Sequence, residues 1–334
     1  MQPDPFSLQL EESACRAACT GRPACRGVVT GRAGQCYLRS SLSLPQCVRD
    51  PQWTVHLAPG YTGAVEPPRE GCQGGVQPYP SSLPSSHYYR QLCTTSSGLR
   101  VVSRGLASST ALLRTAYLLS KVTATVEARV TRAMTARGFR HALMAAYPRE
   151  LTTHLPEHSF LDPAFWNERA RGLGATIAVP LGSSAEENVL CDGADRYRGE
   201  DITVHEFAHS LHLLGLSQVH STFNPELKQL YAAARASGAW GAGHYAMTDY
   251  KEYFAEGVQS YFDANMADPR APVTRAQLRR RDPGLYSLLL RYLAVLYCNS
   301  LYCTVLVTTM VNGCTILYLR CIVVKFATTQ VPWG

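Results

Sequence analysis

The chain has 334 residues, with 32 lysines and arginines against 25 aspartates and glutamates and 12 cysteines. This length allows one substantial domain and a smaller one. The positive surplus, 32 − 25 = 7, is scattered along the chain, and no aromatic or glycine-rich nucleic-acid motif accompanies it. We therefore expect no nucleic-acid partner.

Cysteines gather near the start of the chain, without histidines between them. This cluster consists of Cys15, Cys19, Cys25, Cys36 and Cys47. A dense group of this kind indicates a disulfide framework and an oxidising compartment. The start of the sequence shows no signal peptide. We expect an extracellular protein whose true amino terminus is missing here, or one that leaves the cell by another route.

The spacing of these cysteines favours a small α+β module. Cys15 and Cys19 lie one helical turn apart, and "CRGVV" and "CYL" are typical of short strands. Residues 1–56 thereby resemble the PAN/apple module, in which disulfides join a helix to a sheet. The resemblance implies a protein or carbohydrate ligand, and it leaves Cys47 without an upstream partner. A generic disulfide-rich lobe is the alternative.

Proline, glycine and serine dominate residues 57–92, which predicts a linker. From Ser108, apolar residues recur at helical intervals through "STALLRTAYLLSKVTATVEARVTRAM", which predicts one long amphipathic helix. The runs "FRHALMAAY" and "GATIAVPL" predict strands, with a short helix in "DPAFWNERARGLG" between them. After Gly199 the chain should be mainly helical to about Leu293. Residues 93–293 are therefore expected to form an α+β domain with a small sheet.

Residues 294–334 form a hydrophobic, cysteine-rich tail of uncertain status. Within it, 301–319 carry no charge and approach membrane-spanning length, but threonines, an asparagine and a glycine weaken the signal. An anchor here would leave the preceding domain in the cytosol, in conflict with the cysteine cluster. We do not expect a membrane span, and a carboxyl end unrelated to the domain is the alternative.

The stretch "VHEFAHSLH" contains His205, Glu206 and His209 in the order H-E-x-x-H. Random placement would give about 0.01 such matches per chain. On a helix the two histidines share one face and can reach a single zinc ion, which needs at least one more protein ligand. Glu206 would then lie beside the metal's water as a general base.

The third ligand must come from another part of the chain. His212 lies a turn further along and is poorly placed, whereas a helix beginning near Asp249 puts Glu252 and Glu256 on one face. One of these carboxylates can bind zinc while the other accepts a hydrogen bond from a ligand histidine. In the alternative interpretation, Asp249 and Glu252 form a capping box and Glu256 is a surface charge.

The combination of "HEFAH" with "Y-x6-E-Y-F-A-E" resembles the zincin-type metallopeptidase domain of anthrax toxin lethal factor and its eukaryotic relatives, over residues 93–290. The resemblance implies one zinc ion per chain, Glu206 as the base and Tyr245 near the reacting carbonyl. It also implies a structural thiol at Cys191 or its pairing with Cys93. The implied metal ligands are His205, His209 and Glu252, with Glu256 in support.

We therefore expect a zinc-dependent endopeptidase of the gluzincin type that acts on a peptide or protein substrate. The alternative is an adhesive or scaffold protein with a catalytically silent metal domain. Glu206 argues against silence, because zinc binding alone needs only the three ligands. Cleavage specificity, disulfide connectivity and oligomeric state do not follow from the sequence.

Overall fold

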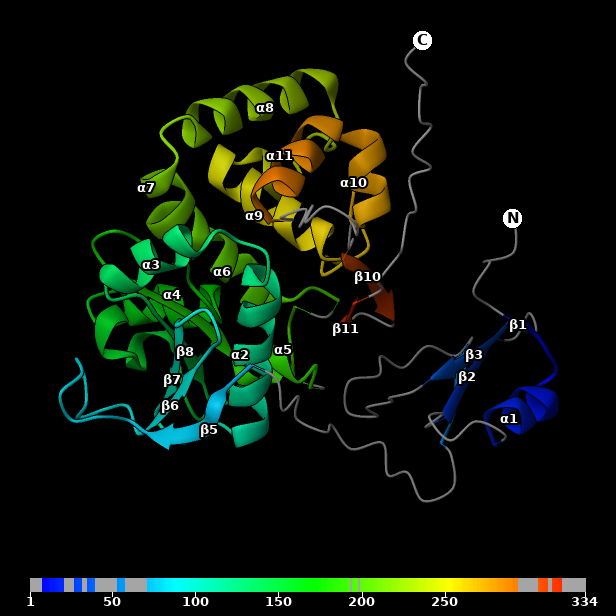
Figure 1. The fold of residues 1–334 in the computed structure, drawn as a ribbon, viewed down its shortest axis with the longest axis horizontal. Helices are drawn as coiled ribbons and strands as arrows, with labels where there is room; N and C mark the ends of the chain where they lie inside the picture. The colour runs from blue at the N-terminus through cyan, green and yellow to red at the C-terminus, as the bar shows by residue number, and fades with distance from the viewer. Residues whose placement is uncertain are drawn as a thin grey trace, which may run out of the picture.

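The computed structural model describes most of the chain between Gly71 and Leu293 and shorter parts on either side. The predicted α+β class is confirmed: a small sheet comes from the first half of this region, and helices dominate the second half (Figure 1). The described ranges are 8–20, 27–31, 35–39, 53–57, 71–192, 194–197, 199–293, 306–311 and 314–319.

The amino-terminal part is a four-stranded antiparallel sheet with one helix. Its strands, in the order β1-β3-β2-β4, are β1 (Leu8–Gln9), β2 (Gly27–Gly31), β3 (Gln35–Arg39) and β4 (Trp53–Leu57). Helix α1 (Glu12–Thr20) is joined to β3 by the Cys15–Cys36 disulfide, and Cys19 is disulfide-bonded too. The predicted helix and strands are thus confirmed, whereas Cys47 lies outside the described residues.

The larger part is built on a five-stranded mixed sheet (Figure 1). The first three strands pair antiparallel, and the last three pair parallel, so that helices cross over between them. In sheet order the strands are β5 (Gln73–Pro78), β6 (Gln91–Thr94), β7 (Arg100–Ser103), β8 (Arg140–Met144) and β9 (Leu181–Ala185).

Part of the predicted linker, 57–92, belongs to this sheet. Residues 73–78 form β5, which pairs with β6, and a disulfide joins Cys72 to Cys93 with Cα atoms 5.3 Å apart. The strand has a register irregularity and lies at the sheet edge, where glycine and proline are tolerated. Because this strand contains glycines and a proline, its sequence is typical of a linker rather than of a strand. The predicted linker is therefore too long at its carboxyl end.

The disulfides also correct the prediction for Cys191. Because Cys93 pairs with Cys72, it does not pair with Cys191. Cys191 is itself disulfide-bonded, so it is not a free structural thiol. Both alternatives considered from the sequence are therefore wrong.

The long helix predicted from Ser108 is two helices, α2 (Ser109–Thr123) and α3 (Ala128–Ala136). Ser108 caps α2 as its position predicts, accepting a hydrogen bond from the backbone N–H of Ala111. The break falls in the sequence "TATVE", where three β-branched residues follow one another closely and lower helix propensity. The Thr125 hydroxyl also donates to the backbone carbonyl of Leu293, which holds the break against the last helix of the domain.

Strand β8 confirms the prediction for "FRHALMAAY", but the strand predicted in "GATIAVPL" is displaced. The observed strand β9 begins only at Leu181, after Pro180, which has no N–H to donate. Its sequence "LGSSA" is small rather than β-branched because it packs tightly: a Cβ on Gly182 would lie 2.8 Å from Oγ of Ser210. Ile177, in the predicted run, is 65% exposed.

Helices cover the sheet and form most of the second half, as predicted from Gly199 to Leu293. Helix α6 packs against β9 and also against α9, so it lies between the sheet and the carboxyl-terminal helices (Figure 1). The remaining α-helices are α4 (Pro163–Arg169), α5 (Glu186–Val189), α6 (Ile202–Leu211), α7 (Ser217–Val219), α8 (Phe223–Ser237), α9 (Tyr250–Tyr261), α10 (Arg275–Arg281) and α11 (Pro283–Leu293).

Two strands are described in the tail, β10 (Leu306–Val311) and β11 (Cys314–Leu319), which pair antiparallel. The segment considered as a membrane span, 301–319, therefore contains a hairpin. Within the described residues, no helix combines the length and apolar character needed to cross a membrane.

Candidate metal centre

Helix α6 carries the H-E-x-x-H motif at the centre of the domain. Asp201 caps its start and accepts a hydrogen bond from the backbone N–H of Val204 at 3.1 Å. Phe207 and Leu211 anchor one face of the helix in the hydrophobic core. The polar motif residues are consequently held on the remaining face, on a rigid element.

Helix α9 supplies the third side chain of the site. Asp249 caps it by accepting hydrogen bonds from the backbone N–H groups of Lys251 at 2.6 Å and Glu252 at 3.0 Å. The Glu252 side chain does not complete a capping box, since its carboxylate contacts the two histidines of α6 instead. The N-cap expected from the sequence is present, and Glu252 is nevertheless free to act as a ligand.

His205, His209 and Glu252 place three ligand atoms around one point. The Nε2 atoms of the two histidines lie 3.2 Å apart, and each lies 3.1 Å from Oε2 of Glu252. Ligands about 2.0–2.1 Å from a tetrahedral zinc ion are separated by about 3.3–3.4 Å. The three atoms therefore nearly match the spacing that one ion requires, and among the described residues they form a group that can hold a metal.

The charges around the group stabilise a cation. Burial disfavours a charge on His205, yet its hydrogen bond with Glu252 and the nearby carboxylates of Glu206 and Glu256 raise its pKa to about 10. Burial likewise disfavours a charged Glu252, but hydrogen bonds with His205 and His209 lower the pKa of its carboxyl. Positive charge is thus favoured at this point, and a divalent ion would supply it.

A residue that the sequence analysis missed, Gln259, orients His205. Nδ1 of His205 lies 2.8 Å from Oε1 of Gln259. The amide nitrogen of Gln259 donates to the backbone carbonyl of Asp201 at 3.2 Å, which fixes the amide with its oxygen toward the ring. In the neutral imidazole this bond keeps the proton on Nδ1 and leaves Nε2 free for a metal.

The sequence predicted that Glu256 accepts a hydrogen bond from a ligand histidine, and this part of its supporting role is wrong. Its carboxylate accepts a hydrogen bond from Asn265 Nδ2 at 2.7 Å, and the contact with a ligand histidine is made by Gln259, less than one turn further along the same helix face. The sequence contains a weak signal for this, because positions 252, 256 and 259 share one helix face.

Replacing Gln259 by leucine should weaken zinc binding about 10- to 100-fold, the usual cost of losing such a supporting hydrogen bond. Competition with a chromophoric zinc chelator measures the affinity. Gln218→Leu is the matched control, since the Gln218 side chain is exposed and donates only to the backbone of Leu213 while accepting from Arg137. Equal affinities of the two variants would show that the Gln259 contact does not orient the ring.

His212 is excluded from the metal group by its surroundings. It begins a π-helical turn, His212–Leu216, and its Nε2 lies 2.7 Å from Oδ1 of Asn224. Its ring packs against Phe223 and Phe254, each with a centroid distance of 5.3 Å, and it is fully buried. The structure thus agrees with the preference for Glu252 over His212 as the third ligand.

Two glycines, Gly172 and Gly174, bring the segment before β9 close to the motif. A Cβ on Gly174 would lie 2.4 Å from Cβ of His209, and one on Gly172 would lie 3.0 Å from Cγ of Glu206. Side chains at these positions would force the segment before β9 away from α6. Gly172 and Gly174 therefore let this segment form one wall of the site.

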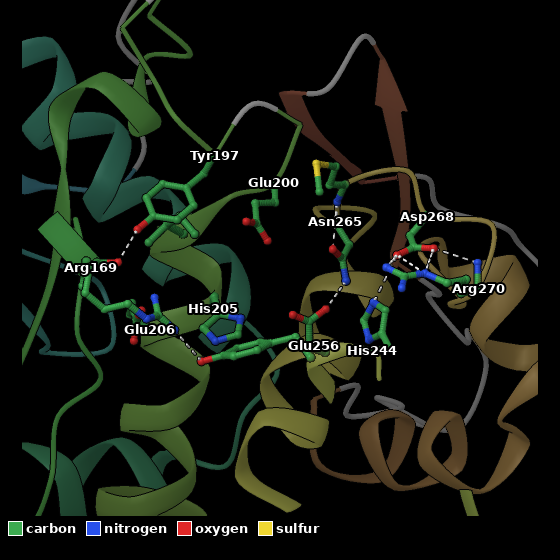
Figure 2. A pocket seen from close by; sticks show the side chains of 15 residues that line it. Arg169, Tyr197, Glu200, His205, Glu206, His244, Glu256, Asn265, Asp268 and Arg270 are labelled. Atoms are coloured by element: carbon green, nitrogen blue, oxygen red, sulfur yellow. Dashed lines mark hydrogen bonds and ion pairs between the residues drawn. The ribbon is translucent and has the colours of Figure 1, made fainter. Parts of the chain in front are cut away.

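Two cavities meet at Glu206. One, of about 450 Å³, is partly apolar. The other, of about 300 Å³ and drawn in Figure 2, is lined mainly by polar and charged residues. Burial raises the pKa of the Glu206 carboxyl, against the effect of the two histidines. The first cavity includes Phe165, Trp166, Leu173 and Leu213, the second includes Glu200, Glu256, Asn265 and Asp268, and both reach Arg169, His205, Glu206 and Tyr245.

Tyr245 lies at the rim of both cavities, in a 3₁₀ turn (Tyr245–Met247) just before α9. Its ring centroid is 6.2 Å from that of His205, and the residue is 44% exposed. Arg169, which the sequence analysis did not single out, donates to Oη of Tyr245 at 3.4 Å. Partial burial and the charge of Glu252 raise the pKa of Tyr245 to about 12, so the phenol keeps its proton as a donor.

Comparison with known proteins adds little to this geometry. No protein-family model matches the sequence, and no curated protein sequence matches it. Among solved structures, the PRO-PRO endopeptidase PPEP-2 from Paenibacillus alvei overlaps 57% of this chain and 96% of its own, with 18% sequence identity and a TM-score of 0.40. An overlap at that level does not establish a shared fold or activity.

Proposed function

We propose that this protein is a zinc-dependent endopeptidase of the gluzincin type, similar to lethal factor. The observation that carries the proposal is the meeting of His205, His209 and Glu252 within 3.2 Å of one another, beside Glu206 and two open cavities. The motifs "HEFAH" and "Y-x6-E-Y-F-A-E" support it from the sequence, since they supply these same residues.

His205, His209 and Glu252 would hold the ion. A bound zinc ion would supply a Lewis acid and lower the pKa of a water molecule toward about 7. Glu206, which lines both cavities, accepts a proton from the attacking water and later gives it to the leaving amine. The protonated phenol of Tyr245 donates a hydrogen bond to the carbonyl oxygen as negative charge develops there.

The remaining parts of the proposal concern the module and the compartment. Residues 1–56 are proposed to be a PAN/apple-like module that binds a protein or carbohydrate, and the disulfide between α1 and β3 supports this arrangement. The Cys15–Cys36 and Cys72–Cys93 disulfides support an extracellular location, because such bonds persist in oxidising compartments.

The test is a combined measurement of zinc and turnover on the full chain. We expect about one zinc ion per chain after zinc loading, and cleavage of a peptide library that a chelator abolishes. A chain that stays metal-free would contradict the metal site and the enzyme together. Zinc binding without cleavage of any peptide would instead favour a silent scaffold protein.

Tyr245→Phe should keep the fold and zinc content and lower kcat by about 10²-fold, the typical loss for removing one donor to a developing oxyanion. The ring is preserved in phenylalanine, so a packing role alone predicts nearly normal kinetics. Zinc content, thermal midpoint and kcat should be measured on one preparation. A kcat within about threefold of wild type would show that Tyr245 has a structural role and does not donate to the oxyanion.

A further inference from the structure

Besides Glu206, the polar cavity beside the metal centre contains two carboxylates that pair with no lysine or arginine among the described residues. Glu200, from the loop before α6, and Glu256, from α9, both extend into this cavity of about 300 Å³ (Figure 2). Its volume lies at the lower end of the range for ligand pockets, about 300–1,000 Å³. The cavity also reaches His205 and Glu206, so any ligand in it would adjoin the reacting atoms.

Glu256 is the more deeply buried of the two, with 5% of its surface exposed. One carboxylate oxygen, Oε2, accepts a hydrogen bond from Asn265 at 2.7 Å. In the part of the chain that the structure describes, Oε1 has no hydrogen-bond partner, and no lysine or arginine pairs with this carboxylate. A buried carboxylate in this state is costly unless a cation approaches it.

Glu200 is in a similar position. Within the described part of the chain, its Oε2 receives a single, long hydrogen bond, 3.5 Å, from Gln259. Burial and the negative charge of Glu256 raise the pKa of Glu200 to about 7, and the charge of His205 opposes this rise only in part. The cations that line the cavity are already engaged: Arg270 pairs with Asp268 at 2.7 Å, and Arg169 donates to Tyr245 at the opposite end (Figure 2).

We propose that this cavity binds the basic side chain, arginine or lysine, of the substrate residue next to the scissile peptide bond. The inference rests on the proposed peptidase function and adds a substrate class to it. A guanidinium carries five N–H donors in a planar fork, so a single group can reach both Glu200 and Glu256. The long aliphatic stem of either side chain would span the mouth of the cavity.

The first experiment measures binding alone, so it does not depend on catalysis. Nα-acetyl-arginine amide and its neutral analogue Nα-acetyl-citrulline amide are titrated into the full chain and followed by calorimetry. We expect the arginine probe to bind at least about tenfold tighter, and Glu200→Gln and Glu256→Gln each to remove most of that preference. Glu226→Gln is the matched control and should retain it, because Glu226 pairs with Arg291 and lines neither cavity.

The second experiment uses zinc-loaded enzyme and pairs of peptides that differ only by arginine or citrulline next to the cleaved bond. The ratio of their kcat/KM values should fall about tenfold in Glu200→Gln and stay unchanged in Glu226→Gln. Equal binding of the two probes would overturn the subsite and leave the peptidase function intact. The same would follow if wild type bound a second zinc ion that Glu200→Gln no longer bound, because the cavity would then be a metal site. Arginine-selective binding without chelator-sensitive cleavage would instead contradict the peptidase function and, with it, the substrate role of the cavity.

Discussion

Replacing Glu206 by glutamine is expected to leave zinc binding intact and to reduce peptide turnover by about 10²- to 10⁴-fold. General acid–base catalysis contributes on this order, and the amide cannot accept the proton of the attacking water. The atoms that can hold a metal belong to His205, His209 and Glu252, so this substitution leaves all three of them in place. The measurements are kcat/KM on a cleaved peptide and zinc content of the same preparation.

Two further variants separate this role from a general loss of charge. Glu206→Asp keeps a carboxylate but shortens its reach, so its turnover should fall between those of wild type and Glu206→Gln. Glu168→Gln removes an exposed glutamate of α4 that lines neither cavity, and it should behave as wild type. If Glu206→Gln retained wild-type turnover, another group would have to be the base.

The helices of the site could be predicted because their signals are local. Asp201 and Asp249 are both N-caps, and apolar residues recur behind each of them at helical intervals. The meeting of α6 and α9 is not local, and it depends on packing between segments about forty residues apart. The choice of Glu252 rather than Glu256 as the third ligand therefore came from the resemblance, and the distances from Glu252 to His205 and His209 are consistent with it.

The features that sequence reasoning missed lack a local signal. Gln259 belongs to no motif, and its role depends on the distance from its amide to Nδ1 of His205. The prediction placed strand β9 too early in the chain. Close packing against α6 selects glycine and serine in the true strand, whereas β-propensity favours residues such as Ile177. Strand β5 was missed because an irregular edge strand can carry glycines and a proline.

The last prediction identifies the third ligand: Glu252→Ala should lower zinc affinity by well over the roughly 10- to 100-fold expected for an outer residue such as Gln259. Alanine keeps the helix, and Asp249 still caps it through backbone N–H groups, so the fold should survive. Glu256→Ala is the matched control one turn later on the same face. It should retain the ion, because the carboxylate of Glu256 contacts Asn265 rather than the histidines.

The rival third ligand is tested by His212→Ala, which should also retain the ion. It should lower the thermal midpoint, since it leaves a cavity among buried aromatic rings. Release of zinc by His212→Ala, with full retention by Glu252→Ala, would show that Glu252 is not the third ligand.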